Sequence, residues 1–288
     1  MKPLSLRLAA LVVSIGRVLA GSRAFQPNLS AARLDRRSWV FDTDRNRQMI
    51  WPNRQIRYCF EDDDAADALR TPLEEADKLW HRTGLGSEFT IAEVGRDECR
   101  DHRQDRLLVR WSGDDGAMAT TVGLPSADST LRRPTNDDPE KRPKMVLTTS
   151  VHMGMLDQVI NFAHELGHAW GLYHEHQNPN FWSSGTISEA KGGTVFGPEN
   201  HNNWKCENLK DYEEKVNNGG GEPVHNPGYD SGFGPRLGPQ DLCRDYTYAA
   251  DNKFTAADYL PMPASRGVGG SDGKTGDDVD WDSIMLCE

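Results

Sequence analysis

Three histidines in one short stretch have the spacing of a metal site. His164 and His168 are four residues apart, so on a helix they project from one face and can reach one ion. Gly171 can adopt a positive φ, which lets the helix end and turn so that His174 returns as a third ligand. Three neutral imidazoles suit zinc and leave a fourth coordination position open for water, as in catalytic sites.

A carboxylate follows the first of these histidines. Glu165 is displaced by one position from His164, so it cannot share the same coordination direction but can reach a water on the metal. Apolar residues ahead of the motif predict a buried helix that would hold these side chains in place. These apolar residues are Met155, Leu156, Val159, Ile160, Phe162 and Ala163.

The complete pattern H-E-x-x-H-x-x-G-x-x-H resembles that of the metzincin metalloproteases. The continuation His174-Glu175-His176 resembles the astacin branch and the secreted fungal proteins similar to it. Ser283-Ile284-Met285, after Asp282, resembles the Met-turn that lies under the zinc of this family, with Met285 as its methionine. Asn178-Pro179 stands where astacins proper have a stretch rich in Arg and Asp.

The resemblance implies an α+β zincin fold. A mixed twisted sheet and two main helices would form an upper lobe at about 50–176, above an irregular lower lobe at about 177–288, with one Zn²⁺ in the cleft between them. It also implies a metalloendopeptidase acting on polypeptide, in which Glu165 accepts the proton of the attacking water and passes it to the leaving amine. Substrate-binding residues remain unknown.

Two features depart from the astacin pattern. Cys287 occupies the position of a tyrosine that helps to hold the oxyanion, and Tyr246, Tyr248 or Tyr259 could replace it. Astacin-like domains also continue beyond the Met-turn, whereas this sequence stops at Glu288, so either the chain is truncated or the pocket is built from the insert before the turn.

These departures keep a second function open. The chain could be a secreted zinc-binding protein of metzincin type, with weak or no proteolysis, that acts by binding a partner. Glu165 favours the enzyme, because a binding module has no chemical use for a base beside the metal.

The N-terminus predicts secretion. Residues 1–20 have the positive start, short apolar run and small-residue cleavage site of a signal peptide. Residues 21–49 read as a pro-segment or flexible arm, since 1–49 have a net charge of +6 and the remainder −17. Arg36-Arg37 is a candidate processing site, with an ordinary disordered terminus as the alternative. The resemblance would make Glu175 the partner of the N-terminus released by cleavage.

Charge and hydropathy restrict the partners. The net charge of −11 argues against nucleic acid, and beyond the N-terminal segment no stretch is long and apolar enough to span a membrane. A monomer is favoured. In a secreted chain the five cysteines should be mostly paired, and sequence proximity favours Cys59–Cys99 and Cys206–Cys243, which leaves Cys287 over.

Several elements are predicted around the metal motif. A helix with Leu69, Leu73, Ala76 and Leu79 on one face is expected to start at residue 72, because Thr71-Pro72-Leu73-Glu74 resembles a capping box. A short strand at Gly116–Val122 is the candidate edge for pairing with substrate, with a plain loop as the alternative. Further strands are expected at Gln55–Phe60, Glu88–Val94, Leu107–Trp111 and Met145–Leu147, a surface loop at 126–144, and helices at Glu207–Val216 and at Thr255–Tyr259, capped by Thr255.

Other conspicuous residues receive structural interpretations. His152 and His201 lack partners at ligand spacing, and His176 is expected to face away from His174 and to serve a structural role. Trp170 is expected to fill the core. The acidic run Asp272–Asp282 matches no EF-hand spacing and is interpreted as a solvated loop rather than a calcium site.

Overall fold

The structure is a computed structural model that describes residues 51–114, 116–124, 142–182, 196, 204–217, 238–262 and 283–286. The predicted signal peptide and basic segment, most of the predicted surface loop, the Asp272–Asp282 run, His201 and Cys287 lie outside these ranges. Among the described residues, no helix combines the length and the apolar character needed to cross a bilayer.

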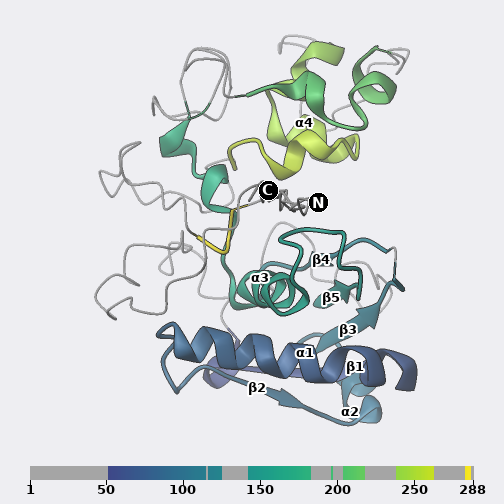
Figure 1. Ribbon diagram of the computed structural model, residues 1–288, viewed down its shortest axis with the longest axis vertical. Coiled ribbons are helices and arrows are strands. Elements are labelled where there is room, and N and C mark those ends of the chain that lie inside the picture. The colour runs from purple at the N-terminus through teal and green to yellow at the C-terminus, as the bar shows by residue number, and fades with distance from the viewer. Residues whose placement is uncertain are drawn as a thin grey trace, which may run out of the picture.

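A five-stranded mixed sheet forms the framework of the N-terminal lobe (Figure 1). The strand order is β2-β1-β3-β5-β4; the first four strands are mutually parallel, and β4 runs antiparallel to β5 at one edge. All four strands expected from the sequence are present, and the short candidate strand forms the edge. The bounds are β1 Gln55–Phe60, β2 Thr90–Glu93, β3 Leu107–Trp111, β4 Ala119–Thr120 and β5 Lys144–Leu147.

Helix α1 spans Asp63–Arg82, so the expected start at residue 72 is wrong. The helix begins after Asp62, whose carboxylate accepts the backbone N–H of Ala65 at 2.8 Å. Pro72 lies inside the helix and cannot donate a backbone hydrogen bond there. Because buried side chains lie on both sides of this proline, the packing of one continuous apolar face outweighs the local stop signal.

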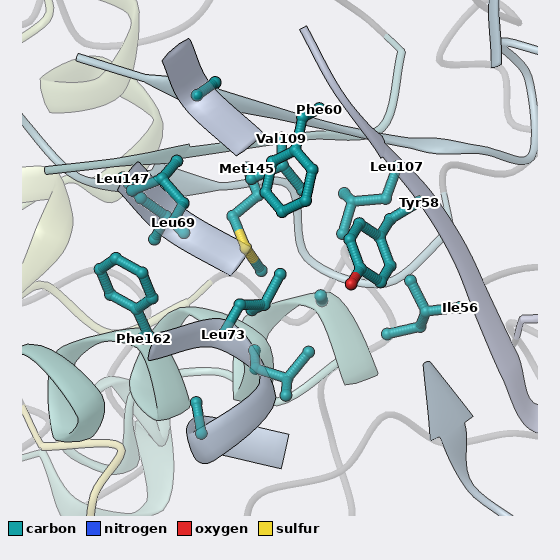
Figure 2. Close-up of a cluster of buried hydrophobic side chains, with 14 of the residues drawn as sticks. Ile56, Tyr58, Phe60, Leu69, Leu73, Leu107, Val109, Met145, Leu147 and Phe162 are labelled. Carbon is teal, nitrogen blue, oxygen red and sulfur yellow. The ribbon is translucent and has the colours of Figure 1, made fainter. Parts of the chain in front are cut away.

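The main core lies between one face of the sheet and two helices, α1 and α3 (Gln158–Trp170). Side chains at alternate positions of three strands point toward both helices, as the period of two along a strand requires. Figure 2 labels this cluster: Ile56, Tyr58 and Phe60 of β1, Leu107 and Val109 of β3, Met145 and Leu147 of β5, Leu69 and Leu73 of α1, and Phe162 of α3. Trp170 packs against the same core, as expected.

The C-terminal lobe, here the described residues within 179–262, has a smaller core of its own and mostly short helices. The helix expected at Glu207–Val216 is wrong: a turn separates a 3-10 helix from a π-helix, and the disulfide at Cys206 ties the first of them to a distant segment. Within the described residues of both lobes, the short helices are α2 Arg96–Asp101 and α4 Tyr246–Asp251, 3-10 helices Pro52–Arg54, Glu175–Gln177, Pro179–Phe181, Cys206–Asn208, Pro239–Cys243 and Thr255–Asp258, and the π-helix Glu213–Asn217.

The expected cap of the last helix also needs correction. Thr255 lies inside that 3-10 helix, and Phe254 holds the N-cap position. The carboxylate of Asp211 accepts hydrogen bonds from both the backbone N–H and the hydroxyl of Thr255. A residue distant in sequence therefore caps the helix, which local sequence cannot reveal.

Two disulfides join the cysteine pairs expected from the sequence. Cys59–Cys99 ties β1 to α2 in the N-terminal lobe. Cys206–Cys243 joins two 3-10 helices of the C-terminal lobe. Each covalent link stays within one lobe, so the connection between the lobes depends on the chain itself and on noncovalent contacts.

Candidate metal centre

Helix α3 carries the first two histidines and ends where the third must turn back. Its N-cap is Asp157, whose carboxylate accepts the backbone N–H of Ile160 at 3.0 Å. At the other end Gly171 adopts φ 101°, and the N–H of Leu172 donates to the carbonyl of Gly167 at 3.0 Å. This is a Schellman motif, which requires a left-handed residue that glycine supplies without strain.

The imidazoles of His164, His168 and His174 converge on one point. Nε2 of His174 lies 3.2 Å from Nε2 of His164 and 3.0 Å from Nε2 of His168. Among the described residues these three form the only cluster of potential metal-ligating side chains, with all ligand atoms within 4.8 Å of one another. The structure therefore brings together the three residues that the sequence selects.

Each of these rings is fixed from behind by a backbone carbonyl. His164 Nδ1 lies 2.6 Å from the oxygen of Ile284, His168 Nδ1 lies 2.8 Å from that of Leu172, and His174 Nδ1 lies 3.3 Å from that of Asp258. A carbonyl can only accept, so each Nδ1 carries the hydrogen. Each Nε2 then presents a lone pair to the shared point, as metal-binding histidines do.

This geometry fits zinc. Three lone pairs that face one another at 3.0–3.2 Å repel unless a cation lies between them. Nitrogens about 2.0–2.1 Å from a tetrahedral zinc lie roughly 3.3 Å apart, close to the observed separations. Burial lowers the pKa of His164, lowers that of His168 to about 3 and places that of His174 well below its ordinary value, so the rings are neutral, as ligands must be.

Glu165 follows the first histidine on α3, lines the same cavity and is only 6% exposed. Burial raises the pKa of its carboxyl group to about 7, and the side chain of Thr120 on the edge strand opposes this shift. Oxygen Oε2 makes no hydrogen bond within the described part of the chain. Glu165 therefore offers one oxygen that can exchange a proton with a bound molecule.

Met285 packs against α3. A Cβ added to Gly167 would lie only 2.5 Å from Sδ of Met285, so the helix and the methionine are in close contact. The turn also holds the ligand-bearing segments: the carbonyl of Ile284 accepts from His164, and that of Met285 accepts the backbone N–H of Glu175 at 2.9 Å.

Two residues flank the third ligand. Glu175 is 1% exposed, so its carboxylate lies inside the protein next to the ligand-bearing segment. The expectation that His176 faces away from His174 is wrong, because the two rings stack with centroids 5.1 Å apart and planes 20° apart. The 3-10 turn of this segment, in place of extended chain, brings the rings together. His176 stays outside the ligand cluster, and its Nε2 lies 2.9 Å from the carbonyl oxygen of Asp258.

A cavity of about 500 Å³ opens in front of these residues. Of the three tyrosines that could replace the missing one, Tyr246 and Tyr259 line it, whereas Tyr248 is buried in the core of the C-terminal lobe. Around the histidines and Glu165 the described lining comes from the edge strand, the loop before α3, the ligand segment, the C-terminal lobe and the Met-turn. These lining residues are Ala117, Met118, Ala119, Thr120, Val122, Met153, Gly154, Met155, Asn161, Tyr173, Gln177, Tyr246, Ala257, Asp258, Tyr259, Met262 and Leu286.

Three groups that shape the site, two backbone carbonyls and one side chain, were not identified from the sequence. The carbonyls of Leu172 and Asp258 fix two ligands, and a backbone carbonyl has no sequence signal. Asn161 lies one turn before the motif and holds the loop that lines the cavity, with both of its amide atoms bonded to that loop. Asn161 lies three residues before His164, so both lie on the same side of the helix, and this spacing could have identified it. The apolar residues around Asn161 instead suggested a position in the core.

Comparisons with known proteins show limited similarity. No protein-family model matches the sequence, and a search of curated proteins finds no match. Matched solved structures include high choriolytic enzyme 1, a hatching enzyme zinc-protease from the medaka fish Oryzias latipes, at 16% identity and a TM-score of 0.29 over 49% of this chain and 55% of that one. Myroilysin matches at 14% identity and a TM-score of 0.34, over 74% of this chain and 66% of that one.

The chain thus spans between about half and two thirds of the length of these two proteins. Its own architecture is α+β, with a mixed sheet, two main helices and a histidine triad facing a cavity. Helix α3 carries the histidine motif, and Met285 packs against this helix.

Proposed function

We propose that this protein is a zinc-dependent metalloendopeptidase. The observation that carries the proposal is the convergence of three Nε2 lone pairs beside the buried carboxyl group of Glu165, at a cavity large enough for part of a polypeptide. His164, His168 and His174 would hold one zinc ion. Bound zinc would supply a Lewis acid that polarises the scissile carbonyl and lowers the pKa of water.

Glu165 would act as the general base and then as the general acid. Its Oε2 would accept the proton of the attacking water and later deliver it to the leaving amine. A pKa near neutrality suits both transfers. The charge of a cation held by the three neutral histidines would favour the ionised carboxylate that starts the cycle. Burial keeps bulk water away from the carboxyl group, which strengthens its electrostatic interactions.

The edge strand β4 would orient the substrate. Within the described sheet β4 pairs only with β5, so its other edge can accept a peptide by strand addition. Gly123, just after this strand, donates its backbone N–H to the carbonyl of His168 at 2.9 Å. This bond fixes the strand relative to α3, and therefore a bound peptide relative to Glu165.

The proposal includes secretion and activation. Residues 1–20 would be removed as a signal peptide, and 21–49 would be a detachable pro-segment, with catalysis in 50–288. The two disulfides support an oxidising, extracellular location. Glu175, buried beside the third ligand, would receive the new N-terminus. We expect a monomer that acts on polypeptide and binds neither nucleic acid nor membrane.

The direct test is cleavage of casein by the purified, processed protein, with and without a zinc chelator, together with metal analysis. The proposal predicts chelator-sensitive cleavage and about one zinc per chain. Bound zinc without cleavage would instead favour the alternative, a zinc-binding protein of the same fold that acts by binding a partner. Cleavage that survives complete removal of metal would exclude the mechanism.

A further inference from the structure

Methionines line the part of the cavity between the edge strand and the start of α3. Met153 and Met155 come from the loop that precedes the helix, and Met118 comes from the stretch that enters β4. The same loop exposes Val151 and Leu156, which are 58% and 67% accessible. We refer to residues 151–156 as the methionine loop. Its two methionines extend the active-site cavity with an apolar surface that the proposed chemistry does not need.

Hydrogen bonds hold the methionine loop in one conformation. Asn161 of α3, only 3% exposed, accepts the backbone N–H of Met155 at 2.8 Å and donates to the carbonyl of Met153 at 2.9 Å. A Cβ on Gly154, whose φ is 57°, would lie 2.5 Å from the Asn161 oxygen, so only glycine fits this approach. Leu156 also has a positive φ, of 56°, which a leucine adopts only where its surroundings impose it.

The charges around the cavity argue against an acidic ligand. Among its described lining residues no lysine or arginine is present, and Glu165 and Asp258 are the only carboxylates. An acidic substrate side chain would therefore find no cation on these walls to pair with. Methionine is flexible and polarizable, so a wall of methionines adapts to large apolar side chains of different shapes.

We infer that Met118, Met153 and Met155 form a specificity surface that binds a bulky apolar side chain of the substrate next to the scissile bond. This inference rests on the proposed peptidase function and adds the class of peptide that the site selects. Asn161 is the positioning residue, because it holds the methionine loop without presenting an apolar surface of its own.

The test uses the processed, zinc-loaded protein and a matched set of fluorogenic peptides that differ at single positions. Leucine, methionine or phenylalanine is compared with aspartate and with lysine on each side of the cut. We expect the apolar peptides to be cleaved with a kcat/KM at least roughly tenfold higher, the range of discrimination that apolar pockets provide. Met155→Glu should remove most of this preference.

Val151→Glu is the matched control, because it adds the same charge to the same loop at an exposed position outside the cavity lining. It should retain the wild-type preference. Cleavage of all peptides at similar rates, or a preference for aspartate or lysine, would overturn the inference while leaving the peptidase intact. Equal effects of the two substitutions would overturn it as well. Failure to cut any peptide would refute the proposed function, and the inference with it.

Discussion

At the scale of single residues, helix α3 places two kinds of ionisable side chain in the same buried environment. Burial raises the pKa of Glu165 to about 7 and lowers the pKa of His164 and His168. Both shifts favour the neutral forms. In the proposed function, the raised pKa makes Glu165 a stronger base near neutral pH, and the lowered pKa values leave the histidine rings unprotonated for metal binding. The two roles can be separated by mutation.

We expect Glu165→Ala to lower casein cleavage by roughly a hundredfold or more, the contribution typical of a general base, while zinc content stays near one per chain. His168→Ala should instead lose the metal, because it removes one of three ligands. Activity assays paired with metal analysis on both variants provide the check. An active Glu165→Ala protein, or a fully zinc-loaded His168→Ala protein, would show that the roles are misassigned.

His176 illustrates a residue that acts through its neighbour. Its ring stacks on His174, and both residues approach the carbonyl oxygen of Asp258. We expect His176→Phe, which keeps an aromatic ring but loses the hydrogen bond, to weaken zinc affinity by roughly tenfold to a hundredfold. Competition with a chromogenic chelator measures this, with the exposed His152→Phe as the control. Unchanged affinity in both variants would remove His176 from the metal centre.

At the scale of elements, the contact between α3 and the Met-turn leaves no room for a side chain at Gly167. An added methyl would meet Sδ of Met285 at 2.5 Å and Cζ2 of Trp80 at 3.0 Å. We expect Gly167→Ala to lower the free energy of unfolding by about 1–3 kcal/mol, as overpacking does, despite the better helix propensity of alanine. Zinc affinity should fall too, because Met285 adjoins the carbonyl that fixes His164.

Urea denaturation provides the measurement for this variant. Gly95→Ala is the control, because an added Cβ there meets nothing within 4 Å. Equal stability of the two variants would mean that α3 and the Met-turn are less closely packed than the structure indicates.

Strand β1 carries a tyrosine that should make the fold sensitive to alkali. Burial, with nearby Glu93 and Glu74 adding to it, raises the pKa of Tyr58 to about 12. The unfolded chain therefore loses this proton at a lower pH than the folded chain does. The contribution of Tyr58 to the free energy of unfolding is complete below pH 10 and falls as the pH rises from 10 to 12. The loss from this group reaches at most about 3 kcal/mol. Urea denaturation of wild type and Tyr58→Phe across this range should give a shallower pH dependence for the variant.

Elements with a strong local period could be predicted from sequence, and those set by distant contacts could not. The parallel strands and α3 carry apolar residues at regular spacing, and their positions were confirmed. The start of α1 was wrong because the capping pattern at Pro72 competes with a longer buried face that only the folded core reveals. The segment at 206–216 was wrong because a disulfide and tertiary packing determine its backbone.

The same division holds at the site. His164, Glu165 and His168 were selected from their spacing, since spacing on a helix determines direction. His174 was selected from the turn that Gly171 allows after the helix. The carbonyls that orient the rings, the methionine loop and the stacking of His176 come from segments brought together only by the fold. These features depend on backbone atoms and on packing between distant segments, and neither is marked by a particular residue type in the sequence.

At the scale of the whole molecule, the proposed peptidase places its reacting groups between two lobes that differ in construction. The N-terminal lobe has a sheet, two long helices and a large core, whereas the C-terminal lobe has short helices around a smaller core. The N-terminal lobe supplies Glu165 and two of the three histidines. The less regular lobe supplies part of the cavity wall and the carbonyl of Asp258.

The segment that carries the third ligand is bonded to the C-terminal lobe at several points. His176 meets the carbonyl of Asp258, the side chain of Gln177 donates to that of Ala257 at 2.9 Å, and the backbone N–H of Met262 donates to the carbonyl of Gln177 at 3.0 Å. Since neither disulfide crosses between the lobes, a metal ion held by all three histidines would brace this junction.

Binding of zinc and attachment of the C-terminal lobe should then be reciprocally linked, because each favours the same arrangement of His174. Chelation should increase amide hydrogen exchange at residues 238–262 more than in the sheet, and zinc should restore protection. Uniform exchange in both lobes would argue against the linkage. If the linkage holds, a lack of zinc would abolish the proposed activity and also expose the C-terminal lobe to unfolding and degradation. The steady-state amount of the protein would then depend on the zinc supply.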